Sequence, residues 1–201
     1  MTLQNRVTPF NELVADPSYR GMFMGNRGLL HDDHRRVVRW RNGKRWITCA
    51  TEFKDCRRTP MTSGRYTELF FLDEATALAA GHRPCAECRR DRFNAFRKAI
   101  AGSGGAVLSA DELDVQLDLE RRDGNAPRRY VEPGSAVPDG AMIAIGEAAY
   151  LVSNGELFAW SSSGYRAAGS MPPGDVTVLT PPLTVKALRG GYVPEPLAPD
   201  R

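Results

Sequence analysis

Short apolar runs separated by turn residues dominate the last third of the chain. Each run has the length of a β-strand, and the intervening segments are rich in Gly, Pro, Asn and Asp, which favour turns. Asn154-Gly155 separates two runs with the pair most typical of a two-residue hairpin turn. This pattern predicts a small antiparallel sheet or partial barrel. The runs span residues 141–145, 149–152, 156–160 and 176–179.

The middle of the chain predicts one strand and two helices. Residues 66–72 favour a strand, and Asp73 is a suitable N-cap for a short helix over 74–80. Gly81 can end this helix in the left-handed conformation, and the proline that follows prevents it from resuming. A second helix is predicted over 88–100. Its buried stripe is expected to consist of Phe93, Phe96 and Ile100.

Residues 36–49 predict a β-hairpin that closes on Asn42-Gly43, a pair that favours the positive φ angles of a type I′ turn. Side chains alternate between the two faces of a hairpin. One face is expected to point to the core and to deliver Cys49 inward. This face carries Arg36, Val38, Trp40, Arg45, Ile47 and Cys49. The opposite face carries Arg39, Arg41, Lys44 and Trp46.

The second face of this hairpin is a basic strip with one aromatic ring. Such a strip suits contact with phosphates while a base or sugar stacks on the ring. A solvated outer face is an equally good interpretation of the same residues.

A Gly-Ser-Gly-Gly segment at residues 102–105 is the best linker candidate. It divides the chain into a region 1–104 and a β-rich region 105–201, in which residues 107–120 favour a helix or strand with an acidic surface. The spacing A-L-x-x-G-x-x-P occurs at 77–84 and again at 187–194, and we interpret it as a shared way to end a helix. The predicted fold class is α+β, with a hairpin-and-helix element followed by a small antiparallel β-rich region.

The composition is that of a globular protein, since 42% of the 201 residues are hydrophobic and 25% are charged. No apolar run has the length of a membrane span, and the first residues do not resemble a signal peptide. We therefore expect a cytoplasmic protein without a membrane partner. In that reducing compartment, clustered thiols favour a metal ion over disulfide bonds.

Charge is unevenly distributed along the chain. Residues 1–100 hold 19 Lys/Arg and 11 Asp/Glu, whereas residues 101–201 hold 8 and 13, so +8 and −5 give the net charge of +3. A basic front half favours contact with a polyanion, and nucleic acid is the commonest large one. The alternative is that the two halves of the chain attract each other.

All four cysteines occur in one stretch, spaced Cys49-x6-Cys56-x28-Cys85-x2-Cys88. A C-x-x-C knuckle together with two further cysteines is typical of a tetrahedral thiolate site for Zn²⁺. The negative charge of four thiolates on one zinc ion needs cations or N–H donors nearby. Arginines adjoin the predicted ligands at positions 57, 58, 89 and 90.

Other interpretations of the thiols stay open. Cys85 and Cys88 alone could form a redox pair of the thioredoxin type, or the thiols could be buried without a ligand. His82 or His34 could replace one cysteine as a metal ligand.

His31-Asp32-Asp33-His34 is a second candidate cluster. Two imidazoles and two carboxylates could hold a metal ion in a hydrolase such as a nuclease. An exposed polar turn is the simpler interpretation. The glycines at positions 21, 25 and 28 match neither the dinucleotide nor the P-loop fingerprint.

The run LFFLDEATALAAGHRPCAEC at residues 69–88 resembles the metal-binding domain of the Ada family of DNA-repair proteins. The resemblance covers roughly residues 45–100 and is specific at the helix and the knuckle. It implies a four-cysteine zinc site and contact with DNA. In that family a zinc-bound cysteine accepts a methyl group from a DNA methylphosphotriester. By position the acceptor is Cys49, with Cys56, Cys85 and Cys88 as the other ligands, although the family separates its first two cysteines by three residues and this chain by six.

The sequence thus predicts a zinc protein that contacts DNA phosphate through a basic surface. Two alternatives are a self-methylating repair enzyme that uses Cys49, and a structural zinc module for protein–protein contacts with the acidic half as partner surface. The predicted nucleic-acid contacts are Arg39, Arg41, Lys44, Trp46, Arg57, Arg58, Arg89 and Arg90.

Overall fold

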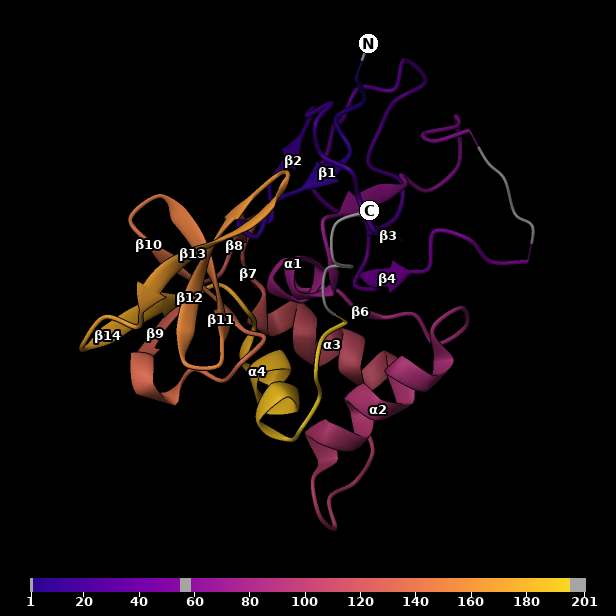
Figure 1. Cartoon of the computed structure of the whole chain (residues 1–201). Coiled ribbons are helices and arrows are strands. Elements are labelled where there is room, and N and C mark those ends of the chain that lie inside the picture. The colour runs from indigo at the N-terminus through magenta and orange to yellow at the C-terminus, as the bar shows by residue number, and fades with distance from the viewer. Residues whose placement is uncertain (1, 55–58, 196–201) are drawn as a thin grey trace.

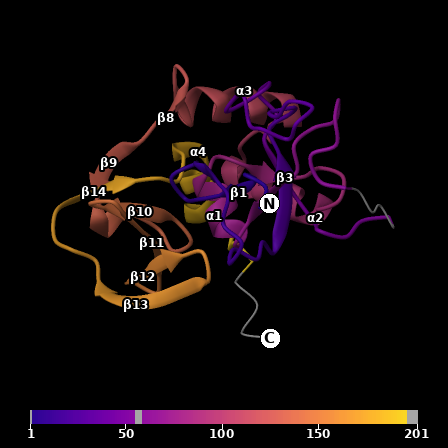
Figure 2. The same cartoon turned by 90° about the horizontal axis from the view of Figure 1, so that it is seen from above.

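The computed structural model describes residues 2–54 and 59–195, which form an α+β fold with mostly antiparallel sheets (Figure 1). This confirms the α+β class and the antiparallel β-rich region, but not the predicted hairpin-and-helix element. The strands of the N-terminal part lie on one side of helix α1 and the C-terminal sheet lies on the other (Figures 1 and 2). None of the described helices is long and apolar enough to cross a membrane.

The first sheet is mixed, and its strands run in the order β2-β1-β5-β3-β4-β6. β1 pairs in parallel with β5, and β4 pairs in parallel with β6, whereas the other neighbours are antiparallel. Gly25 permits the close pairing of β3 with β4, because a Cβ there would collide with the Ile47 carbonyl oxygen. The strands are β1 (Arg6–Val7), β2 (Leu13–Val14), β3 (Phe23–Asn26), β4 (Ile47–Cys49), β5 (Leu69–Phe71) and β6 (Arg83–Pro84).

The second sheet is antiparallel throughout, as the sequence predicts, in the order β13-β12-β11-β10-β14-β9. Asn154 and Gly155 join β11 to β12 with φ angles of 51° and 74°, which confirms the predicted hairpin turn. A short separate hairpin, β7 (Arg122–Asp123) with β8 (Ala126–Pro127), precedes this sheet. The strands of the sheet are β9 (Tyr130–Pro133), β10 (Met142–Ile145), β11 (Ala148–Ser153), β12 (Glu156–Ser161), β13 (Gly164–Ser170) and β14 (Asp175–Val178), with a 3-10 turn at Gly134–Ala136.

Helix α1 (Glu74–Ala79) has the ends that the sequence predicts. The Asp73 carboxylate accepts a hydrogen bond from the Thr76 N–H at 2.7 Å, which caps the N-terminus. Gly81 adopts a positive φ of 78° directly after the helix. The N–H groups of Gly81 and His82 then donate to carbonyls of the last turn, which is the pattern of a Schellman motif.

The A-L-x-x-G-x-x-P echo corresponds to two helix ends of the same kind. After α4 (Pro182–Arg189), the N–H groups of Gly191 and Tyr192 donate to the carbonyls of Leu188 and Ala187, at 3.0 Å in each case. Gly191 has a φ of 91°. The shared spacing is therefore a shared way to end a helix, as interpreted from the sequence.

The largest hydrophobic core lies among α2 (Arg90–Ala101), α3 (Ala110–Glu120), α4 and the second sheet. The predicted stripe of α2 is buried in it, and α3 begins with a capping box formed by Ser109 and Glu112. This one core combines residues from both sides of the predicted linker. Its members include Leu78, Phe93, Phe96, Ile100, Leu113, Leu117, Ile143, Val178 and Leu188.

The predicted hairpin over 36–49 is wrong. β4 forms at its end, but the partners of β4 are β3 and β6. Residues 32–46 form an irregular loop, in which the Asn42 N–H donates to the Arg27 carbonyl at 2.9 Å. Gly43 has a positive φ whereas Asn42 does not, so the type I′ turn is not made. The local turn signal is outweighed by long-range strand pairing.

The two predicted hairpin faces are also wrong. Val38, expected in the core, is 55% exposed, and Trp46, expected on the outer strip, is fully buried. Two guanidinium groups contact the ring of Trp46, with Cζ of Arg27 4.3 Å and Cζ of Arg121 4.1 Å from its centroid. These cation–π contacts, with the edge of Trp40 against the same ring, explain why Trp46 points inward.

Candidate metal centre

Three cysteines converge at the edge of the first sheet. The Sγ atoms of Cys49, Cys85 and Cys88 all lie within 4.8 Å of one another. Cys49 is the last residue of β4, Cys85 directly follows β6, and Cys88 precedes α2. Because β4 and β6 pair in parallel, with the Cys85 N–H donating to the Thr48 carbonyl at 2.9 Å, the two strands end side by side and bring the sulfurs together.

Backbone N–H groups of the knuckle point at sulfur. The Glu87 N–H donates to the Cys85 Sγ at 3.4 Å. The pKa of Cys85 is lowered, first by hydrogen bonds from the Cys49 and Cys88 thiols and then by the backbone N–H groups of Cys88 and Glu87. The pKa of Cys49 is raised, mainly because its thiol donates to Cys85 and Cys88. The cluster is thus arranged to stabilise thiolate at one sulfur, which is the form that binds metals.

The donor set fits a thiolate-binding metal ion. Four sulfurs placed tetrahedrally about 2.3 Å from a zinc ion lie about 3.8 Å from each other, within the span seen here. Cys49, Cys85 and Cys88 are free thiols, and the first two are buried while Cys88 is partly exposed. Cys56, the predicted fourth ligand, lies outside the described residues.

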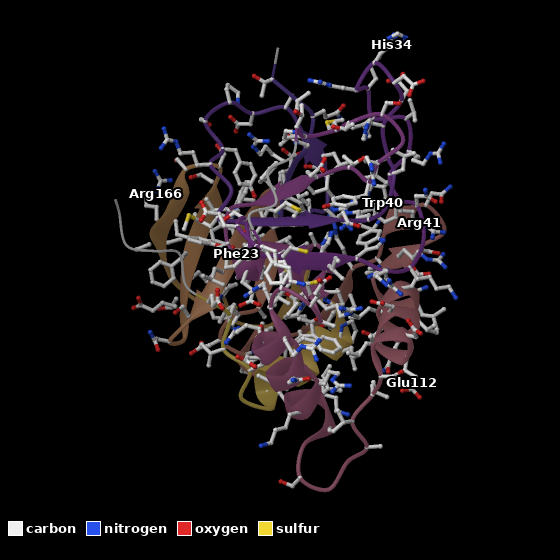
Figure 3. The ribbon with its side chains drawn as sticks, turned by 90° about the vertical axis from the view of Figure 1, so that its right-hand side faces the viewer. Phe23, His34, Trp40, Arg41, Glu112 and Arg166 are labelled. Atoms are coloured by element: carbon white, nitrogen blue, oxygen red, sulfur yellow. The ribbon has the colours of Figure 1, made fainter. Side chains whose placement is uncertain are left out.

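Among the described residues, no histidine joins the cysteine cluster. His82 is fully buried, and its Nε2 lies 3.2 Å from the Arg27 Nε, which donates to it. His34 is exposed in the loop after β3 (Figure 3). The interpretation that His82 or His34 replaces a cysteine as a ligand is therefore wrong for the part of the site that the structure describes.

The His31-Asp32-Asp33-His34 cluster does not form a metal site within the described residues. His31 is buried, and its Nδ1 lies 2.7 Å from the Thr67 hydroxyl. The Asp32 carboxylate instead accepts hydrogen bonds from the N–H groups of His34 and Arg36, each at 2.9 Å. These contacts make a polar turn, which the hydrogen bonds of His31 with Thr67 and of Ser63 with Asp33 tie to residues 62–67.

The predicted nucleic-acid contacts are not all on the surface. Arg39, Lys44 and Arg90 are exposed, and Arg41 is half-buried with its Nη1 4.0 Å from Asp118. Arg89 is buried and pairs with Glu74 at 2.9 Å, so the prediction that it is a surface contact is wrong, as it is for Trp46. Arg57 and Arg58 lie outside the described residues.

Sequence reasoning missed the ion pairs between the two halves of the chain. Asp114 and Asp118 of α3 are buried rather than part of an acidic outer surface. Arg83 forms a bidentate pair with Asp114 at 2.8 and 2.9 Å, and Arg45 approaches the same carboxylate at 3.8 Å. These pairs support the alternative that the basic and acidic halves attract each other. Helical periodicity marks Asp114 and Asp118 on one face of α3, which is the signal that could have identified them.

A basic surface remains after these pairs are formed. The exposed loop residues Arg35, Arg39 and Lys44 have no acidic partner among the described residues. Figure 3 shows Trp40 and Arg41 at the same edge of the molecule, with Glu112 of α3 below them. We refer to residues 35–45 as the basic loop. It lies at the start of β4, and Cys49 lies at the end of that strand.

Comparisons with protein-family models, with curated proteins and with solved structures found no match to this chain. The resemblance to the Ada metal-binding domain therefore stays a prediction. What the residues of the site can do must be inferred from their geometry.

Proposed function

We propose that this chain binds Zn²⁺ through Cys49, Cys56, Cys85 and Cys88, and that the zinc-stabilised protein contacts DNA phosphate through a basic surface. The convergence of three sulfurs from different elements within 4.8 Å carries the metal part of the proposal. Soft thiolate ligands favour zinc over hard cations such as Mg²⁺ or Ca²⁺. Cys56 is the remaining cysteine of the four in the chain and is thus the natural fourth ligand.

The basic loop supports the DNA part of the proposal. Arg35, Arg39 and Lys44 of this loop have no acidic partner in the described part of the chain, so they can neutralise phosphates and release the counterions bound there. The side chain of Arg36 is 73% exposed and lies 3.8 Å from Asp32, a surface pair that contributes little. Arg90 adds an exposed cation close to Cys88.

A purely structural zinc ion is the second candidate function. Two arginines that adjoin the ligands turn inward, because Arg83 pairs with Asp114 and Arg89 pairs with Glu74. The metal would then act mainly by tying β4, β6 and the start of α2 together. In that case, replacement of the basic loop leaves function unchanged.

Metal content tests the first part of the proposal. Protein purified without added metal should contain one zinc ion per chain by elemental analysis, and Cys85→Ser should lose it. Substitution by Co²⁺ should give sulfur-to-metal charge-transfer bands whose intensity corresponds to four thiolates, and Cys56→Ser should reduce them. Zinc-free wild-type protein, or full zinc retention in Cys85→Ser, would reject the site.

Salt dependence tests the second part. We expect the affinity for a labelled DNA duplex to fall steeply as salt rises, with a slope of about −0.9 per phosphate contact. The triple variant Arg35→Ala/Arg39→Ala/Lys44→Ala should lower this slope by about 3. The variant Arg20→Ala/Arg166→Ala/Lys186→Ala removes the same charge from exposed positions elsewhere and should leave the slope nearly unchanged. If the two variants change the slope equally, the basic loop is not a DNA contact, and only the structural role of the zinc ion remains.

Mass spectrometry separates the repair alternative from simple DNA contact. Incubation of the zinc-loaded protein with methylphosphotriester DNA would add one methyl group to Cys49 if that residue is an acceptor. Cys49 is only 7% exposed, whereas Cys88 is partly exposed. Methylation elsewhere, or none, excludes the role predicted for Cys49.

A further inference from the structure

A small recess lies between the turn after β1, the end of α3 and the hairpin β7–β8. It has a volume of about 10 Å³, enough for one water-sized group or one oxygen atom of a larger ligand. Both halves of the chain contribute to its walls, and three of the lining residues are arginines. The lining residues include Phe10, Asn11, Arg121, Pro127, Arg128 and Arg129.

Two buried side chains that line this recess each have a polar atom without a hydrogen-bond partner among the described residues. Arg121 is 2% exposed, and its Nη1 and Nη2 donate to the carbonyl of Gly81 at 3.0 Å and to the Asp118 carboxylate at 3.2 Å. Its Nε has no hydrogen-bond partner among the described residues. Asn11 is 4% exposed, and its Oδ1 is likewise without a partner. An Asn amide presents either its oxygen or, after rotation, its nitrogen.

Two further arginines stand at the mouth of the recess. The Arg128 N–H donates to the Arg121 carbonyl at 3.0 Å, which extends the β7–β8 hairpin by one pair and places these residues side by side. Cζ of Arg129 lies 4.9 Å from the ring centroid of Phe10, which holds this guanidinium at the rim. Both are exposed, and neither has an acidic partner among the described residues.

We propose that Asn11, Arg121, Arg128 and Arg129 form a binding site for a phosphate group, with one phosphate oxygen in the recess. That oxygen would accept from the Arg121 Nε while the two rim arginines pair with the remaining oxygens, in the charge-assisted manner that guanidinium groups favour. Burial lowers the pKa of Arg121 to about 10, so a nearby anion would offset the cost of keeping its charge.

The neighbouring carboxylates offset this positive charge only in part. Asp118 pairs with Arg121 at 3.2 Å, but it also pairs with Arg122 at 2.8 Å and lies 4.0 Å from Arg41, so one carboxylate is shared by three arginines. The Glu12 carboxylate accepts from the Thr8 hydroxyl at 3.2 Å and is exposed. The recess thus has a surplus of positive charge.

The site adjoins the basic loop. Trp40 Nε1 donates to the Asn11 carbonyl at 3.2 Å, and Arg121 donates to the Lys44 carbonyl. A strand of nucleic acid that contacts Arg39 and Lys44 could therefore continue onto Arg128 and Arg129. If the phosphate group belongs to a nucleic acid, this inference rests on the proposed function. Binding of a free phosphate ion does not depend on it.

Two binding measurements on the zinc-loaded protein test the site. In the first, inorganic phosphate should raise the Tm saturably above that in sodium chloride of equal ionic strength. In the second, the affinity for a short DNA oligonucleotide should fall about tenfold in Arg128→Ala/Arg129→Ala. Arg20→Ala/Arg166→Ala removes the same charge elsewhere on the surface and should behave like wild type in both. Asn11 has a positive φ of 70°, which an aspartate also tolerates. The variant Asn11→Asp should therefore fold normally and weaken phosphate binding, because it adds a negative charge.

The two measurements distinguish a free-phosphate site, a nucleic-acid contact and the absence of a site. A phosphate response that Arg128→Ala/Arg129→Ala abolishes assigns the site to free phosphate, and it survives even if the protein binds no DNA. An effect of this variant on the oligonucleotide alone assigns the site to the nucleic-acid surface. If neither ligand binds to wild type, or if the variant matches the charge control in both measurements, the site is rejected.

Discussion

Glu74 is a buried acidic residue that pairs with Arg89, the residue directly after Cys88 of the knuckle. It is fully buried, and its carboxylate pairs with Arg89 at 2.9 Å and with Arg92 at 2.8 Å, while the Tyr192 hydroxyl donates to it at 2.5 Å. Arg89 directly follows Cys88, so this pair supports the backbone that carries a proposed ligand. From the sequence alone Glu74 is only an acidic residue in a first helical turn. Its partners are separated from it by 15 to 118 positions and could not be predicted.

We predict that Glu74→Gln lowers the free energy of unfolding by about 3 kcal/mol, because it leaves the buried Arg89 and the half-buried Arg92 with only the partly exposed carboxylate of Glu195 as a counter-charge. Zinc affinity should fall as well, since Arg89 adjoins Cys88. Denaturant unfolding and competition with a zinc chelator measure the two effects. Glu87→Gln is the matched control, because Glu87 lies in the knuckle but pairs with Lys54 on the surface at 3.1 Å. It should cost less than about 1 kcal/mol, and an equal cost for both variants would contradict the prediction.

Asp73 predicts a pH dependence. Burial raises its pKa above the ordinary value of 3.8, although its hydrogen bonds from Thr76 and Tyr165 oppose this. Where the pKa is raised, the folded chain retains a proton that the unfolded chain has released. The contribution of Asp73 to the free energy of unfolding therefore falls as pH rises from 3.8 through the raised pKa, and it is restored at lower pH.

The variant Asp73→Asn isolates this contribution, since Asn also caps helices well. We expect the stability of wild type relative to Asp73→Asn to decrease as pH rises from about 4 towards neutral. Urea unfolding of both proteins across that range provides the measurement. Parallel curves for the two proteins would show that Asp73 does not titrate differently on folding.

At the scale of elements, α1 and α4 provide a matched pair of helix ends. Gly81 and Gly191 both have positive φ angles, so alanine costs about 1–2 kcal/mol at either. A Cβ at position 191 meets nothing within 4 Å, whereas one at position 81 would lie 2.7 Å from Cδ of Arg121. Arg121 is buried and held by the Gly81 carbonyl, so it cannot easily move away.

We therefore predict that Gly81→Ala destabilises the protein by at least about 1 kcal/mol more than Gly191→Ala. Urea denaturation of the two variants compares them directly. Because Arg121 forms part of the recess, Gly81→Ala should also weaken the phosphate response, while Gly191→Ala should not. A reversed order of stability would mean that Arg121 is not fixed against α1.

The elements that the sequence predicts well are those whose signals are local. The ends of α1 follow from Asp73 and Gly81, and the hairpin at Asn154-Gly155 closes between strands adjacent in sequence. Asn42-Gly43 carries the same local signal, yet residues 47–49 pair with β3 and β6 instead. The partners of residues 47–49 lie outside the predicted hairpin, and Trp46 is buried against Arg27 and Arg121 instead of lying on an exposed strip. Long-range pairing of this kind is not encoded in any short window.

At the scale of the whole molecule, the charge asymmetry of the sequence has a structural role. Arg41, Arg45 and Arg83 from the front half reach the aspartates of α3 in the rear half. The core also joins α2 to α3 and α4 across the predicted linker. The clustering of Cys49, Cys85 and Cys88 could be predicted from the spacing of the cysteines, because a C-x-x-C knuckle with further cysteines is typical of metal sites. The sequence could not predict which arginines remain free to contact a polyanion, because this depends on which arginines pair with the aspartates of α3.

This arrangement predicts that metal removal acts locally rather than on the whole chain. The three cysteines lie at the ends of β4 and β6 and just before α2, whereas β10, β11 and β12 contribute Ile143, Val152 and Leu157 to the hydrophobic core away from the cysteines. After chelation, amide hydrogen exchange should accelerate in residues 47–49 and 85–92 and stay slow in β10, β11 and β12. Added zinc should restore protection in wild type.

The variant Cys85→Ser supplies the control for this exchange experiment. It should exchange rapidly at the knuckle from the start and respond neither to chelator nor to zinc. Uniform acceleration across both sheets would mean that the metal controls the cooperative stability of the whole fold, because β4, β6 and α2 then unfold together with the second sheet. Unchanged protection at residues 85–92 after confirmed loss of zinc would mean that Glu74 and the backbone pairing of β6 hold the knuckle without the metal.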